Sequence, residues 1–224
     1  MKKLNRFLIN RRNAYPLFCF IITSENALGK EAQDVPSKRI LSKATSGAMA
    51  GIVGGMALAS SFMGIDSQLG VPSGTFYKMI GLLVDLKGID AIVFGFCVHI
   101  STAALIGSVF FVCSTFHRTL HISSFQKGVF AGGVTGLEVF AIFFLPINLF
   151  IMIPAVEQVT MNPAQYGLTL DDIQPIKQLL SNTDGILWGS LYLHLLYGVV
   201  MGFFAGAMLP HEYPTMPRKD SYQR

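Results

Sequence analysis

The sequence has little charge. Only 13% of its 224 residues are Asp, Glu, Lys or Arg, about half of the roughly 25% that is usual in soluble domains. Four long stretches hold a single charged residue between them, Glu138, and each exceeds the roughly 20 residues that a helix needs to cross a bilayer. The composition therefore argues against an ordinary soluble globular protein and predicts an all-α, polytopic membrane protein with four transmembrane helices, at residues 44–65, 91–116, 128–153 and 185–209.

Cysteine and the common catalytic motifs are also scarce. The chain has three cysteines, Cys19, Cys97 and Cys113, and no CxxC pair, which argues against a disulfide framework and a structural zinc site. There is no phosphate-binding loop, no dinucleotide fingerprint and no Ser/His/Asp constellation. We therefore expect a protein that is not an enzyme, with no catalytic residues and no metal site.

The basic residues that do occur are unevenly distributed. Of the 17 Lys and Arg, fourteen fall in residues 1–43, in the 116–127 connection and after Pro210. The other two connections hold three basic and seven acidic residues. By the positive-inside rule this alternation predicts both termini on the cytoplasmic side of a cell membrane. The net charge of +4 is not gathered on one module, so a nucleic-acid partner is not expected.

Residues 1–43 do not read as one clean segment. A basic start and a short apolar run at 15–23 resemble a signal peptide, but the run is brief and Pro16 interrupts it. We favour a basic cytoplasmic segment lying on the membrane surface, followed by a polar linker. Cleavage of this segment, or a start codon chosen too far upstream, are the alternatives. Residues 210–224 are expected to form a disordered cytoplasmic tail.

The outer connections each predict a short helix. Residues 76–86 are apolar but too short to span, and we expect a helix lying at the outer interface. Asp171 and Asp172 could open another, ending near Leu180. In the third spanning helix Pro146 removes a backbone donor and should kink the outer third.

Small residues recur at every fourth position in all four spanning helices. This spacing places them on one helix face, where helix backbones approach closely in membranes. The helix-packing candidates are Gly47, Gly51, Gly55, Gly95, Gly107, Gly128, Gly132, Gly136, Gly198, Gly202 and Gly206. The pattern repeats from the first helix to the third and from the second to the fourth. It predicts two duplicated hairpins around a pseudo-two-fold axis. These rows of small residues, here called glycine stripes, are more numerous than four helices need for packing within one chain. They therefore favour homo-oligomers or contact with other membrane subunits.

Two histidines lie on these small-residue faces. His99 follows Asp90 by nine residues and His194 follows Asp184 by ten, so both should sit about 14–15 Å below the outer boundary and could face each other. Three interpretations are open. The imidazoles could be neutral and fix helix register. They could be axial ligands of a b-type haem, with Gly95, Ala103 and Gly198 making room for the ring. They could also titrate along a proton pathway.

Glu138 is the costliest residue to insert, because an ionised carboxylate near the bilayer centre costs roughly 2.5–3.5 kcal/mol on insertion scales. Helical spacing places it away from the Gly128–Gly132–Gly136 face. It could relay protons to His99 or His194. Otherwise it is a protonated carboxyl bonded within the bundle, or a contact to a partner subunit.

Several local patterns carry a family resemblance: the glycine-rich first helix, Gly95-Phe-Cys-Val-His99, Lys127-Gly128 and Leu193-His194-Leu-Leu-Tyr-Gly198. Over residues 44–208 the chain resembles small four-helix prokaryotic membrane proteins of the YagU-like type. The resemblance implies an integral cytoplasmic-membrane protein without an assigned activity, and the long basic N-terminal segment departs from it.

Together these observations predict a non-enzymatic accessory or structural subunit of a membrane assembly, in contact with the lipid bilayer. The alternatives are a haem electron-transfer protein and a small proton-coupled transporter or channel.

Overall fold

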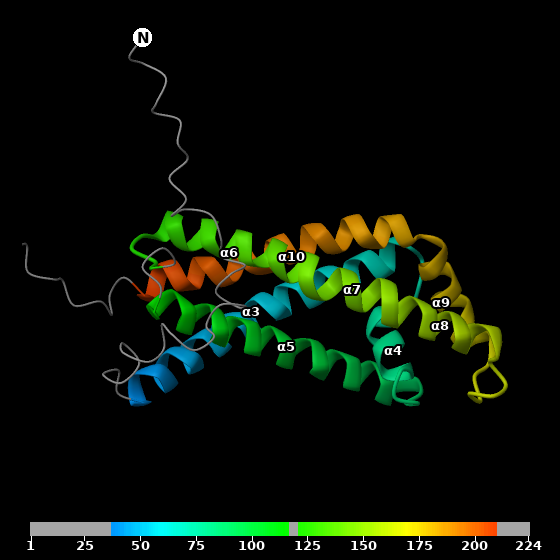
Figure 1. Ribbon diagram of the computed structural model, residues 1–224. Helices are drawn as coiled ribbons and strands as arrows, with labels where there is room; N and C mark the ends of the chain where they lie inside the picture. Colours follow the sequence, from blue (N-terminus) through cyan, green and yellow to red (C-terminus); the bar gives the residue numbers. More distant parts are fainter. Residues whose placement is uncertain (1–36, 117–120, 210–224) are drawn as a thin grey trace, which may run out of the picture.

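The structure is a computed structural model that describes residues 37–116 and 121–209, and these residues fold entirely into helices and turns (Figure 1). The predicted N-terminal surface segment lies outside the described residues as far as residue 36, and so does the predicted tail from residue 210. Four helical stretches are long and apolar enough to cross a membrane: 40–68, 88–115, 125–161 and 183–208. They mark the chain as a multi-pass integral membrane protein.

The first spanning helix, α3 (Ser37–Gln68), is longer than predicted. It begins at Ser37, within the segment that the sequence predicted to be a polar linker up to Ser42. Charged residues near the end of a spanning helix do not stop it, because the helix can extend beyond the hydrocarbon and the long side chains reach toward the interface. The predicted boundary at residue 44 marks the start of the apolar run and not the start of the helix.

The short helix α4 (Thr75–Leu82) forms where a helix was predicted, and most of its residues are covered by other parts of the chain. Six of its eight residues are buried, including Tyr77 at 1% exposure. It packs against α5 (Gly88–Phe116) so closely that Cβ atoms at Gly81 and Gly95 would meet the backbones of Ala91 and Tyr77. Helix α4 therefore plugs one end of the bundle.

The third spanning stretch is made of five consecutive segments. These are α6 (Phe125–Val139), the π-helical η1 (Phe140–Phe144), α7 (Leu145–Ile147), the π-helical η2 (Asn148–Met152) and α8 (Ile153–Met161). The two π-helical segments contain Ile142 and Phe150, each four residues before a proline, Pro146 and Pro154. Widening the helix there relieves the clash between the proline ring and the carbonyl four residues back, so the irregularity predicted from Pro146 takes the form of π-helix.

Helix α9 (Leu170–Ser181) confirms the short helix predicted at Asp171 and Asp172. Thr169 and Asp172 form a capping box at its start. Ile173, Ile176 and Leu179 are buried on one face. Lys78 of α4 donates to Asp172 at 2.7 Å, which ties α9 to α4.

The last helix, α10 (Thr183–Met208), packs along α6, and α3 packs along α5. The two pairs join mainly through α3 and α10, and the helices cross obliquely and diverge toward their ends (Figure 1). The core between the pairs is apolar, with Phe111, Met201 and Ala205 fully buried.

Candidate functional site

His194 lies in the interior of the bundle, 8% exposed, with its ring nitrogen Nδ1 at 2.7 Å from the Ser190 carbonyl. A carbonyl can only accept, so Nδ1 carries a proton and donates in this bond. The rings of Phe140 and Phe144 in η1 flank it, with centroids 5.7 and 4.9 Å away. His194 is thereby fixed in position by its own helix and by two aromatic neighbours.

His99 lies on the side of α5 that packs against α3, and its ring approaches the Gly55 backbone. Its ring nitrogen Nε2 is buried and has no hydrogen-bond partner in the part of the chain that the structure describes. The Tyr77 ring lies against it at 5.6 Å between centroids.

The structure brings the two histidines to the same level. Each is the twelfth residue of its helix, counting from Gly88 in α5 and from Thr183 in α10. One turn further along, the Tyr197 hydroxyl donates to the Ala103 carbonyl at 2.8 Å. This side-chain bond links α10 to α5, although the main packing between the two pairs is of α3 on α10.

Glu138 is not part of this pair. It is half-buried on α6, and the described residues include no hydrogen bond or ion pair to its carboxyl. Gly136, two positions earlier, faces α10, where a Cβ would meet the His194 carbonyl. A two-residue step turns the helix by about 200°, so Glu138 points away from that contact. Its role as a relay or as a contact to a partner subunit stays a prediction.

The small residues next to the histidines do not leave a slot for haem. A Cβ at Gly95 would meet the Tyr77 backbone, and one at Gly198 would meet the Gly132 backbone. Ala103 sits against α3, with its Cβ 2.7 Å from where a Gly55 Cβ would be. The space expected for a porphyrin ring is taken up by helix backbone, so the residues present do not fit a haem between His99 and His194.

Two buried polar residues of the site were not singled out from the sequence, Asp66 and Tyr77. The Asp66 carboxylate, 2% exposed, accepts from the Gly74 backbone N–H at 2.8 Å, at the start of α4. Burial raises the pKa of the Tyr77 hydroxyl and the nearby Asp66 carboxylate raises it further, so the phenol stays neutral. In the sequence Asp66 looked like an ordinary polar residue at the end of the first spanning helix. The signal available for its role was its place eight positions before Gly74, where the next helix starts.

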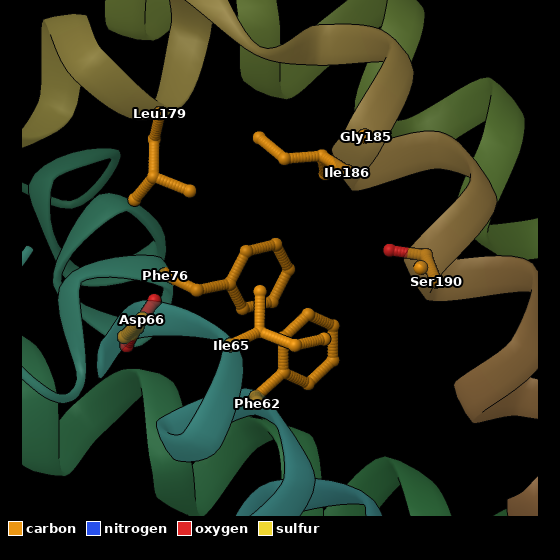
Figure 2. Close-up of a pocket in the computed structure, with 9 residues that line it drawn as sticks. Phe62, Ile65, Asp66, Phe76, Leu179, Gly185, Ile186 and Ser190 are labelled. Carbon is orange, nitrogen blue, oxygen red and sulfur yellow. The ribbon is translucent and has the colours of Figure 1, made fainter. Parts of the chain in front are cut away.

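A small cavity lies between Asp66 and α10, with Asp66 and Ser190 on opposite sides of it (Figure 2). Outside this cavity, His194 Nδ1 and the Tyr197 hydroxyl bond to backbone carbonyls. The Tyr77 hydroxyl and His99 Nε2 have no hydrogen-bond partner among the described residues. Within residues 37–116 and 121–209, no three His, Cys, Asp or Glu side chains come together as metal ligands would. The site consists of separate polar groups, the Asp66 carboxylate among them, in a largely apolar interior.

Comparison of the chain with protein-family models, with curated proteins and with solved structures returned no match.

Proposed function

We propose that this chain is a non-enzymatic structural or accessory subunit of a membrane assembly. The observation that carries the proposal is the open arrangement of its spanning helices. Helix α5 packs mainly on α3 and α4, and α6 packs mainly on α10, so the outer helix of each pair has an unoccupied flank. Large apolar side chains cover these flanks, including Phe130 and Phe150 at 74% and 78% exposure. Lipid can cover such surfaces, and so can the helices of a partner.

The glycine stripes support this proposal less than the sequence suggested. Glycines of α3 and α5 contact each other, as do those of α6 and α10: a Cβ at Gly132 would lie 2.6 Å from the Gly202 Cα. The stripes are thus used inside the chain and cannot also be the surface of a homo-oligomer. Assembly, with other subunits or with further copies, would use the α5 and α6–α8 flanks instead.

Several finer statements belong to the same proposal. The matching glycine contacts within each pair favour two duplicated hairpins. The loop charges favour both termini in the cytoplasm and the cell membrane as the location. The likeness to YagU-like membrane proteins rests on residue pattern alone.

The two alternatives have less support. A haem protein would need a slot that helix backbone occupies, as described above. A proton-coupled transporter would need a continuous series of polar groups on both sides of the central histidines. Toward the chain ends, Met201 and Ala205 of α10 are fully buried among apolar neighbours. The buried polar residues described at that end are Lys43 and Ser114.

The experiment is extraction of the tagged chain from its native membrane in polymer nanodiscs, followed by identification of co-purifying proteins. We expect one or more membrane proteins in fixed ratio to the chain. A Phe130→Ala/Phe150→Ala variant should lose them, whereas Met49→Ala/Met56→Ala on exposed positions of α3 should retain them. Recovery of the chain alone, as a monomer, would refute the proposal.

A further inference from the structure

The cavity beside Ser190 is at the end of the bundle that α4 and α9 close, away from the chain ends. Figure 2 shows it enclosed by α3, α4, α9 and α10. Its lining is apolar except at two places, Asp66 and Ser190. The lining residues are Phe62, Ile65, Asp66, Phe76, Leu179, Gly185, Ile186, Gly189 and Ser190.

The Ser190 side chain is unusual among the hydroxyls of the spanning helices. Ser61, Thr102 and Ser108 each donate to the carbonyl four residues earlier, as hydroxyls in helices commonly do. Ser190 does not do so. Its Oγ is buried, with the residue 1% exposed, and has no hydrogen-bond partner among the described residues. It points into the cavity (Figure 2).

The size of the cavity limits what can bind there. The space open to the centre of a water molecule is about 10 Å³, near the lower limit of roughly 10–15 Å³ that one water needs. A buried hydroxyl without a partner is unfavourable, and a water molecule that bonds to it removes the penalty. The aromatic wall, with Phe62 and Phe76 stacked at 4.6 Å between centroids, leaves no room for a larger ligand.

We propose that the Ser190 hydroxyl binds a water molecule that enters this cavity from the α4–α9 end of the bundle. The same residue's carbonyl accepts from His194 Nδ1 at 2.7 Å, so this water lies about one helical turn from His194. Among the residues that line the cavity, Asp66 of α3 is the titratable one. Access from the opposite end would have to pass the fully buried Met201 and Ala205 of α10, so we expect water to enter from the α4–α9 side.

Silver ion, a water-sized cation that binds thiols, tests whether the cavity at Ser190 can be reached from the solvent. Ser190→Cys is made in a chain with Cys19, Cys97 and Cys113 replaced by Ala, and Ag⁺ is added to either side of sealed vesicles. Protected thiols are counted after denaturation as those that a maleimide no longer labels. Gln165→Cys, exposed in the loop between α8 and α9, identifies the α4–α9 side. Ala205→Cys, fully buried on the same helix as Ser190, is the matched control.

We expect Ag⁺ to protect Ser190→Cys from the side on which it protects Gln165→Cys, at least tenfold faster than from the other side. Ala205→Cys should stay unprotected from both sides. Labelling of Ser190→Cys that Ag⁺ does not reduce, or protection only from the other side, would overturn the proposal.

Thermal unfolding of Ser190→Ala in nanodiscs is an independent test that does not need a new thiol. If the hydroxyl holds a water, its removal should lower the Tm by a few degrees. If the hydroxyl is dry and unpartnered, removing it should raise the Tm, and that result would also overturn the proposal.

Discussion

At the scale of single residues, the polar groups inside the bundle serve to connect helices. Tyr197 on α10 donates to the carbonyl of Ala103 on α5 at 2.8 Å, in a buried position. His194 is held by a hydrogen bond to the Ser190 carbonyl of its own helix. The interpretation of the histidines as neutral groups that fix helix register stays a prediction. The sequence identified both histidines, because each stands alone on a small-residue face. It could not identify Tyr197 as their companion, because a tyrosine in an apolar helix is common.

The Tyr197 hydroxyl can be removed without a large change in volume. Tyr197→Phe should lower the free energy of unfolding by about 0.5–1.5 kcal/mol, the net value of a typical buried hydrogen bond. Reversible unfolding in mixed SDS–detergent micelles measures this. Tyr192→Phe, at a position 66% exposed, is the control and should change stability by less than about 0.5 kcal/mol. Equal effects of the two substitutions would mean that the bond to Ala103 contributes nothing.

At the scale of helices, backbone contact within each pair dominates the packing. The sequence predicted close contact from glycine spacing, because only glycine lets backbones touch. It could not say which helices would form the pairs, since the stripes are similar on all four. The sequence also could not predict that α4 is buried, because a short apolar helix suits a membrane interface as well as a core.

Neighbouring glycines on α6 provide a matched pair for testing this contact. A Cβ at Gly132 would lie 2.6 Å from the Gly202 Cα, whereas one at Gly133 would come no closer than 3.5 Å to Leu195. Gly132→Ala should therefore destabilise the protein by about 1–3 kcal/mol through overpacking. Gly133→Ala should be neutral or stabilise by up to about 1 kcal/mol, because alanine favours helix. Unfolding measurements that rank the two variants in the opposite order would contradict the α6–α10 contact.

The ion pair between α4 and α9 predicts a pH dependence. Hydrogen bonds from Lys78 and Thr169 hold the pKa of Asp172 at about 2, below its ordinary value of 3.8. A lowered pKa in the folded state stabilises above the ordinary pKa, and this contribution disappears as the pH falls from about 4 to about 2.

Because the pair is partly exposed, with side-chain exposures of 16% and 32%, its contribution is about 0–1 kcal/mol. Lys78→Gln should lower the Tm slightly at pH 6, and this difference should shrink to half or less at pH 2, where the Asp172 carboxyl is about half protonated. Lys177→Gln, which alters a lysine of α9 without that ion pair, is the control. A Tm difference for Lys78→Gln that is as large at pH 2 as at pH 6 would mean that the effect does not come from the ion pair.

At the scale of the whole molecule, the four apolar runs were enough to predict a multi-pass all-helical protein, because hydropathy and length are properties of the sequence. The ends of the spans were less predictable. Helix α3 continues into polar sequence, and the third span runs to Met161 and not to 153, because π-helical segments let it pass both prolines. The cavity at Ser190 could not be predicted, because it depends on how four helices converge.

The central claim is that the buried polar groups of the bundle are structural and do not form a continuous path through it, so that the protein is a static component and not a proton pathway. Proton flux into proteoliposomes under an imposed pH gradient and potential tests this most directly. We predict the same flux as for empty liposomes, unchanged by His99→Ala or Glu138→Gln. A proton flux well above that of empty liposomes, abolished by His99→Ala in a variant that still folds, would contradict the account.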